Sequence, residues 1–303
     1  MSSVKNVGVV KTEPERISIL CPTRNRPDQL VAMMDSALKM ALKPQLIEFC
    51  LYIDLDDDSC KQIQFSENVK IIRGPRMWLS SMYNTLITAA SGEYFFWSGD
   101  DVIFLTHGWD EELRNGINSF SSKLGVVHVN DMATSYPQKY ATIGMVHRIW
   151  VDVFGYIFTP HLRDNGIDFW ISNVANQIGR RLYLGDVKVE HRQYRQGKVT
   201  IDQTYIDRLD DHKTYSPLEI YRLLIDERRR DALLLQSKDS GIRVGFNPRY
   251  VLANIFLDLT ELITRRKLSP RRKIYIGSLS NLSLVTTLLR KIGIKTRINH
   301  WDS

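Results

Sequence analysis

The sequence has few of the features that mark secreted or membrane-spanning proteins. Its 303 residues include only three cysteines, Cys21, Cys50 and Cys60, which do not make an even disulfide framework. No apolar stretch approaches the ~20 residues that a membrane-spanning helix needs. The opening residues 1–5 lack the apolar core of a signal peptide. We therefore expect a cytoplasmic protein with reduced cysteines and no transmembrane segment.

Charge is present in ordinary amounts but is distributed unevenly. Residues 1–200 contain 22 Lys and Arg against 22 Asp and Glu, whereas residues 201–303 contain 19 against 12, so the net charge of +7 lies in the last third. Three clusters contribute most visibly: Arg228–Arg230, Arg265–Lys267 and Arg271–Lys273. Such clusters favour phosphate-rich partners, which makes a nucleic-acid acceptor or peripheral membrane contact two hypotheses for this part. A solvated helix face explains them equally well.

Strands and helices alternate through most of the chain. Hydrophobic periodicity predicts strands at 16–21, 47–53, 69–72, 94–97, 125–129 and 181–191, and helices at 28–42, 79–90, 109–120 and 166–178. This alternation predicts an α/β fold with a mostly parallel sheet and right-handed crossovers. We divide the chain into an N-terminal arm (1–15), an α/β catalytic domain (16–200) and a basic C-terminal extension (201–303). The extension combines predicted helices at 201–240 and 251–263 with a small α/β unit at 273–298.

Two acidic residues close the strand at 94–97. The strand is short, aromatic and uncharged, which is typical of a strand buried on both faces, and Gly99, Asp100 and Asp101 follow it. In open α/β sheets ligands bind at the carboxyl ends of the strands. Neighbouring carboxylates repel each other unless a cation or a hydrogen-bond donor shares their site. A turn with two solvated acids is the alternative for this pair taken alone.

Two further loops belong to the same expected edge of the sheet. The loop after the first strand, Pro22, Thr23, Arg24, Asn25 and Arg26, offers backbone donors, a hydroxyl, an amide and two guanidinium groups, which suit a nucleotide. The loop after the second strand opens with Asp54, a carboxylate able to accept hydrogen bonds from a base or a ribose. The third loop carries the Asp100–Asp101 pair, which is able to hold a divalent cation that bridges a diphosphate.

These segments together resemble the family 2 glycosyltransferases, which have the GT-A fold. Residues 17–26 resemble the opening strand of that family, and residues 84–94 are similar to the helix and strand before its Asp-x-Asp metal motif. Asp168–Trp170 resembles the segment that supplies the catalytic base. Residues 179–191 resemble the closing strand with its metal-binding His, so the resemblance covers residues 16–195.

The resemblance implies a metal-dependent glycosyltransferase that moves a sugar from a nucleotide-sugar donor, with a UDP-sugar preferred, to an acceptor hydroxyl with inversion. It assigns donor contacts to Pro22, Thr23, Arg24, Asn25, Arg26, Asp54, Arg76 and Asp100, Mn²⁺ or Mg²⁺ ligation to Asp101 and His191, and the general base to Asp168. Asp164 is the alternative base. Ser98 stands where the first acid of Asp-x-Asp is expected, which leaves the division of roles between Asp100 and Asp101 open.

Other functions stay open at this point. A nucleotidyltransferase would share the sheet and the metal, but it typically opens with a Gly-rich phosphate loop, and residues 22–26 contain no glycine. A catalytically inactive nucleotide-sugar-binding relative would fit the Ser98 substitution. The acceptor stays open between a saccharide, whether lipid-linked or protein-linked, and DNA, the last in a DNA-modifying sugar transferase such as a viral one. Four tryptophans are expected in the core rather than at a sugar site: Trp78, Trp97, Trp109 and Trp170.

Overall fold

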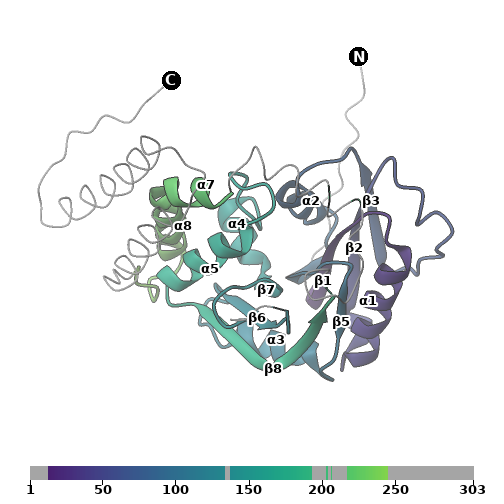
Figure 1. The fold of residues 1–303 in the computed structure, drawn as a ribbon. Helices are drawn as coiled ribbons and strands as arrows, with labels where there is room; N and C mark the ends of the chain where they lie inside the picture. The colour runs from purple at the N-terminus through teal and green to yellow at the C-terminus, as the bar shows by residue number, and fades with distance from the viewer. Residues whose placement is uncertain (1–12, 134–136, 193–202, 204–205, 207–216, 245–303) are drawn as a thin grey trace, which may run out of the picture.

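The computed structural model describes residues 13–133, 137–192, 203, 206 and 217–244 (Figure 1). The first twelve residues of the expected N-terminal arm lie outside the described residues. So do the expected helix at 251–263, the α/β unit at 273–298 and the two basic clusters at 265–267 and 271–273.

The core of the fold is one mixed, mostly parallel sheet. Its eight strands follow the order β3-β2-β1-β4-β7-β6-β8-β5. Their bounds are β1 Glu13–Thr23, β2 Ile47–Asp54, β3 Val69–Gly74, β4 Gly92–Trp97, β5 Val102–Phe104, β6 Val126–Asn130, β7 Gly144–His147 and β8 Arg181–His191. β1 pairs in parallel with β2 and β4, β2 with β3, and β6 with β8, whereas β7 and β5 pair antiparallel to their neighbours. The predicted α/β fold with a mostly parallel sheet is confirmed.

Helices cover both faces of this sheet (Figure 1). α1 (Pro27–Met40) and α3 (Trp109–Asn118) pack on one face, where Leu30 and Leu113 are fully buried. α2 (Leu79–Leu86), α4 (Arg148–Phe154), α5 (Ile167–Gln177) and α8 (Ile225–Lys238) pack on the other, and α7 (Pro217–Leu223) precedes α8. Cover on both faces explains the unbroken apolar strands, such as β2, in which every residue is buried.

Two short elements differ from the sequence expectation. Residues 144–154, an unassigned apolar segment, form the strand β7 followed by α4. The three-residue strand β5 was not predicted, because so short a run carries no periodic signal. β5 is nevertheless important for the site, because it follows Asp101 directly and pairs with the end of β8.

The strand order places a topological switch point between β1 and β4. β1 has β2 and then β3 on one side, while the chain returns to β1's other side with β4. Crossover connections therefore leave β1 and β4 in opposite directions, which opens a crevice at their carboxyl ends. Thr23, at the end of β1, and Asp100, just beyond β4, lie at this crevice.

The first basic cluster is only in part the exposed patch that its charge suggested, because Arg228 is buried whereas the Arg230 side chain is 67% exposed. Arg228 is only 4% exposed, donates to Asn173 Oδ1 from Nε at 3.2 Å, and lies 3.7 Å above the Tyr221 ring. Asp231, also buried, accepts a hydrogen bond from Trp170 Nε1 at 2.8 Å. These contacts fix α8 to α5, so Arg228 is part of the core and is unavailable to an external phosphate.

Candidate active site

Asp100 is bound by two side chains from the loop after β1. Thr23 Oγ1 donates to Asp100 Oδ2 at 2.8 Å, and Arg26 Nη1 donates to Asp100 Oδ1 at 3.1 Å. Only 4% of Asp100 is exposed. Burial raises the pKa of Asp100 to about 6; Arg26 opposes this shift and neighbouring Asp101 adds to it. The predicted meeting of the β1 loop with the acidic pair is thus present in the structure.

The acidic loop after β2 is joined to the same β1 loop. Arg24 Nη1 donates to Asp54 Oδ2 at 2.9 Å, and its guanidinium forks onto both oxygens of Asp56 at 2.5 and 2.9 Å. Asn25 has a φ of 55°, a left-handed conformation that Asn tolerates, and its N–H donates to Asp57 Oδ2 at 2.8 Å. The two loops therefore form one rigid wall of the crevice.

Asp54 is buried with its hydrogen bonding incomplete. It is 1% exposed, and Arg24 occupies Oδ2, whereas Oδ1 has no hydrogen-bond partner among the described residues. Burial raises the pKa of the Asp54 carboxyl; the Arg24 guanidinium and the positive charge of Arg76 act against that shift. Arg76 thus lies near Asp54, which fits the place that the resemblance gave it. An orphaned, buried acceptor of this kind is unusual in a purely structural role.

Asp101 faces His191 because β5 pairs with β8. The antiparallel register sets Val102 opposite His191, and Asp101 Oδ1 lies 3.3 Å from His191 Nε2. The carbonyl of Asp101 also accepts a hydrogen bond from the N–H of Arg192 at 2.8 Å. The structure therefore brings together the two residues that the resemblance assigned to a metal, although 89 intervening positions separate them in the sequence.

Asp131 is a further buried acid at this edge of the sheet that sequence reasoning missed. It follows β6 at the same carboxyl edge, is 1% exposed, and its carbonyl accepts the His191 N–H at 3.2 Å. A signal was available, since an acid follows the predicted strand 125–129 just as Asp54 and Asp100 follow theirs. Within the described ranges, no group of three or more His, Cys, Asp or Glu side chains is placed to hold a metal ion.

Ser98 and Gly99 explain the altered acidic motif. Ser98 is 1% exposed, its N–H donates to the Leu20 carbonyl at 3.1 Å, and its own carbonyl accepts from Tyr83 Oη at 2.9 Å. It thus extends the β1–β4 junction and is buried there. A Cβ on Gly99 would come within 2.5 Å of Asp101 Oδ1, so glycine is required for the acid to sit where it does.

The candidate base lies on a segment attached to the same edge. Asp168 is in the first turn of α5, with Oδ1 accepting the Phe169 N–H at 3.0 Å. Upstream, the Arg163 carbonyl accepts the Ser80 N–H at 2.9 Å, at the start of α2. α2 begins where the chain leaves the carboxyl end of β3, so this hydrogen bond joins the segment that contains Asp164 and Asp168 to that edge, and both stay candidates for the base.

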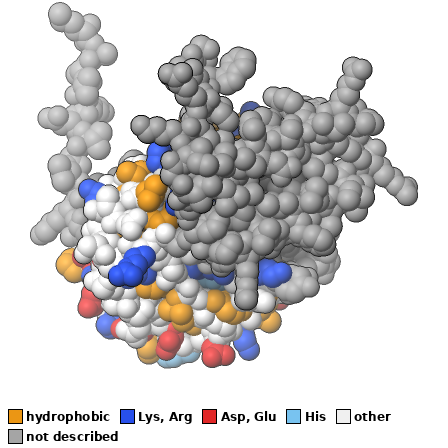
Figure 2. All heavy atoms as spheres, turned by 90° about the vertical axis from the view of Figure 1, so that its left-hand side faces the viewer, with side chains coloured by type: hydrophobic (Ala, Val, Ile, Leu, Met, Phe, Trp, Pro, Cys, Tyr) orange, Lys and Arg blue, Asp and Glu red, His pale blue; other side chains and the backbone are white. Residues whose placement is uncertain are grey.

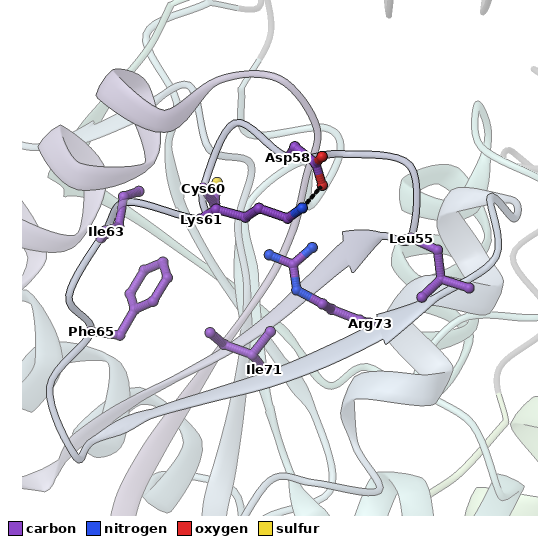
Figure 3. Close-up of a pocket in the computed structure, with 8 residues that line it drawn as sticks. All are labelled: Leu55, Asp58, Cys60, Lys61, Ile63, Phe65, Ile71 and Arg73. Atoms are coloured by element: carbon purple, nitrogen blue, oxygen red, sulfur yellow. Dashed lines mark ion pairs between the residues drawn. The ribbon is translucent and has the colours of Figure 1, made fainter.

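A cavity of about 390 Å³ lies elsewhere, between the 55–65 connection and β3 (Figure 3). It is lined by Leu55, Asp58, Cys60, Lys61, Ile63, Phe65, Ile71 and Arg73. None of these is a predicted site residue. Lys61 is paired with Asp58 at 2.8 Å, and Arg73 Nη1 donates to the Asp57 carbonyl at 3.0 Å. Residues that line the cavity therefore join the acidic loop to β3.

Comparison with known proteins agrees with this arrangement. The family model for glycosyl transferase family 2 matches residues 18–149. The chain has a family 2-like glycosyltransferase fold of the GT-A type. The match and the fold together make this protein a glycosyltransferase. The comparison with curated protein sequences gives no significant match.

Several solved structures share the fold of this glycosyltransferase. TarS 1-349 from S. aureus has a TM-score of 0.52 at 14% identity, with 95% of this chain and 94% of that chain covered. TarS 1-349 in complex with UDP-GlcNAc has a TM-score of 0.52 at 13% identity, with 95% of each chain covered. The complex with UDP has a TM-score of 0.50 at 12% identity, covering 95% and 94%. Against a longer TarS structure the TM-score is 0.48 at 15% identity, and the match spans only 36% of that chain.

The sequence expectation for the four tryptophans is only partly correct. Trp97, Trp109 and Trp170 are at most 3% exposed, as expected of core residues. Trp78 is 41% exposed, so its assignment to the core is wrong. It occupies the N-cap position of α2, and the Arg163 guanidinium lies 4.2 Å from the centroid of its ring.

Proposed function

We propose that this glycosyltransferase moves a sugar from a nucleotide-sugar donor, with a UDP-sugar preferred, to an acceptor hydroxyl in a metal-dependent reaction that inverts the anomeric centre. One observation carries the proposal. At the switch point of the sheet, Thr23 and Arg26 bind Asp100, and the β5–β8 pairing sets Asp101 against His191. The TarS complexes with UDP and UDP-GlcNAc support the choice of donor.

Donor binding would use the wall formed by the loop at 22–26 and the acidic loop. Pro22 to Arg26 line the crevice with backbone groups and two guanidinium groups, which suit a diphosphate. The Oδ1 of Asp54, which has no partner in the part of the chain that the structure describes, offers an acceptor to an N–H of the base. Arg76, whose charge already acts on Asp54, would add a cation beside the donor.

The residues present fit a hard divalent cation, Mn²⁺ or Mg²⁺. Asp101 and His191 would hold it, with Asp100 next to them contacting ribose or metal. Two protein ligands suit such a cation, because these ions commonly bind through one or two side chains plus the substrate's phosphate oxygens. When bound, the ion would supply Lewis-acid stabilisation of the negative charge on the leaving diphosphate.

Asp168 would act as the general base. The acceptor oxygen attacks the anomeric carbon, the bond from that carbon to the diphosphate oxygen breaks, and the acceptor proton passes to the carboxylate of Asp168. A sugar hydroxyl is a weak nucleophile, so proton removal by a positioned carboxylate accelerates transfer. Attack from the face opposite the leaving diphosphate gives inversion. Asp164 is the second candidate because it lies four residues away on the same segment.

Thermal-shift binding tests the donor site. The full chain is titrated with nucleoside diphosphates and nucleotide sugars, with and without Mn²⁺, beside Asp101→Asn and the matched control Asp58→Asn, an exposed acid of the acidic loop. We expect a UDP-sugar to stabilise the wild type only with metal, and that effect to vanish in Asp101→Asn alone. Stabilisation that persists without metal, or in Asp101→Asn, contradicts the proposed site.

Binding without turnover would identify a catalytically inactive relative instead. Transfer of a nucleoside monophosphate from a nucleoside triphosphate to a sugar phosphate, with release of pyrophosphate, would identify a nucleotidyltransferase. Product analysis by mass spectrometry separates these outcomes from sugar transfer.

A nucleic-acid acceptor or membrane contact would depend on the residues after 244. Arg228 is buried, and the described part of the face in Figure 2 carries interspersed basic, acidic and hydrophobic side chains rather than one basic patch. None of the helices in the described part of the chain has the length and apolarity needed to cross a bilayer. A truncation after residue 244 is the appropriate test, because Ala232 and Leu235 of α8 are core residues. Salt-dependent DNA binding, or flotation with anionic liposomes, lost in that truncation would support these partners.

A further inference from the structure

The two arginines of the loop after β1 reach to different sides of that strand. Arg24 donates to Asp54, at the end of β2, at 2.9 Å. Arg26 donates to Asp100, just beyond β4, at 3.1 Å, and β1 lies between β2 and β4. Residues two apart in an extended chain point to the same side, so a bend between the two arginines explains the two directions. Asn25 forms that bend, because its φ of 55° is left-handed rather than extended.

Asp57, a buried acid of the loop after β2, binds this bend directly. The Asn25 N–H donates to Asp57 Oδ2 at 2.8 Å, and Oδ1 accepts the Ser59 N–H at 2.9 Å. The Asp57 carbonyl accepts from Arg73 Nη1 at 3.0 Å, which fixes the acid to β3. Burial acts to raise the pKa of Asp57, but the hydrogen bonds from Ser59 and Asn25 outweigh it, so the pKa lies below its usual value. The acceptor on the bend is therefore a charged carboxylate at neutral pH.

We propose that Asp57 is a positioning residue for donor binding: its carboxylate holds Asn25 in the left-handed conformation and thereby sets the guanidinium groups on either side of Asn25. The inference rests on the proposed function, because it takes the loop at 22–26 as a donor contact. Asp57 needs no contact with the donor for this role, since its effect passes through the loop that it binds.

The bend at Asn25 needs such support because the left-handed conformation is unfavourable for a residue with a Cβ, although Asn tolerates it better than most. A charged acceptor favours the conformation in which the N–H reaches it. Without the carboxylate, the free loop would also populate extended conformations, in which the two guanidinium groups no longer reach both sides of β1. The donor would then bind only the fraction of molecules that have the bend, and its apparent affinity falls by that fraction.

A buried carboxylate at the other end of the sheet provides a matched control. Asp110 is 0% exposed, as is Asp57, and it also accepts two backbone N–H groups, from Leu42 at 2.8 Å and from Lys43 at 3.0 Å. Leu42 and Lys43 precede β2, so this site lies at the amino end of the sheet. Asp110→Asn therefore disturbs comparable hydrogen bonds away from the crevice, which separates a loss of folding from a loss of donor positioning.

The test is calorimetric titration of the full chain with UDP and Mn²⁺, comparing the wild type with Asp57→Asn and Asp110→Asn. An amide has one acceptor oxygen where the Asp57 carboxylate has two, so Asp57→Asn cannot keep both N–H donors as they are. Melting temperature, donor KM and kcat are measured on each protein. Asn25→Gly, alone and combined with Asp57→Asn, completes a double-mutant cycle, because glycine takes the left-handed conformation without support. Hydrogen exchange of the Asn25 N–H is followed in the wild type without UDP and with it.

We expect Asp57→Asn to weaken UDP binding about tenfold and to raise the donor KM rather than lower kcat. Asp110→Asn should lower the melting temperature and leave UDP affinity unchanged. In the Asn25→Gly background, Asp57→Asn should weaken UDP binding less than about threefold, because the bend no longer depends on the carboxylate. The Asn25 N–H should be protected from exchange in the free wild type.

Three results would overturn the inference: UDP affinity that is the same in Asp57→Asn as in the wild type, an equal loss of affinity with and without Asn25→Gly, or an Asn25 N–H that is protected only when UDP is bound. The last result comes from the wild type and decides the question even if Asp57→Asn does not fold. A wild type that binds no UDP would instead contradict the proposed function.

Discussion

The two ends of β2 each carry a buried carboxylate, and the two differ in how completely they are hydrogen-bonded. Glu48, near the amino end, and Asp54, at the carboxyl end, are both 1% exposed. Glu48 accepts hydrogen bonds from Ser18 Oγ, from the N–H and Oγ of Ser91 and from the N–H of Gly92, and it pairs with Lys70 at 2.8 Å. Asp54 has Arg24 on one oxygen and, among the described residues, no partner on the other.

The pKa shifts of the two carboxyls have opposite signs for this reason. Burial alone would raise both. At Glu48 the hydrogen bonds from Lys70, Ser18 and Ser91 outweigh burial and lower the pKa, whereas at Asp54 burial prevails over Arg24 and raises it. A carboxylate with complete hydrogen bonding joins β1, β2, β3 and β4 at the end that holds the fold. Asp54, with its incomplete hydrogen bonding, lies at the end where we propose that the donor binds.

The largest expected effect is a loss of catalysis when a candidate base at the carboxyl end of the sheet is replaced. We predict that Asp168→Asn lowers kcat by about 10²–10⁴-fold, because the amide cannot take the acceptor proton. The measurement is transfer of radiolabelled sugar, with donor affinity determined alongside. Asp164→Asn is the matched variant, and a larger loss there would move the role of base to Asp164. The melting temperature of both variants is measured as well, so that a loss of catalysis is separated from a loss of folding.

A second prediction concerns the opposite end, where loss should appear as instability. Glu48→Gln should lower the free energy of unfolding by about 2–4 kcal/mol, because it removes the charge that satisfies Lys70 and several buried donors. Chemical denaturation measures this, with the exposed Glu67→Gln as control. The folded pKa of Glu48 is below its ordinary value of 4.5, so its contribution is present above that pH and is lost as pH falls through the folded pKa. An unchanged unfolding free energy would contradict the stabilising role that we assign to Glu48.

Much of the fold and of the site could be predicted because the signals are local. Apolar runs of strand length, bounded by turns, indicated six of the eight strands. The rule that ligands bind at carboxyl ends then gathered Thr23, Asp54 and Asp100 at one edge, which the structure confirms. The resemblance supplied the pairing of Asp101 with His191, which no local pattern could give.

What could not be predicted depends on contacts between distant segments. β5 is three residues long and exists because β8 pairs with it. Arg228 looked like part of a basic surface, but the rings and carbonyls that surround it come from α5, α7 and the start of α8. Trp78 was expected in the core because tryptophan is usually buried, and residue type alone does not reveal that this side chain is exposed at the start of α2. The hydrogen bonds of Glu48 come from Ser18 on β1 and from Ser91 and Gly92 at the start of β4. They depend on how the strands pair, which the sequence of β2 alone does not reveal.

The smallest predicted effect is that of Asp54→Asn, and it tests most directly whether the two ends of β2 have different roles. Asp54→Asn should weaken donor binding about tenfold, because the amide presents a weaker acceptor to the base and loses the charge that orients Arg24. Its raised pKa means that the ionised carboxyl costs folding free energy at neutral pH, and this cost offsets the ion pair that the variant also loses. We therefore expect a change in unfolding free energy below about 1 kcal/mol, against the larger loss in Glu48→Gln. Calorimetry with UDP and denaturation of the free protein measure the two quantities. If Asp54→Asn instead unfolds the protein as readily as Glu48→Gln, the open oxygen of Asp54 is a structural defect and not a ligand position.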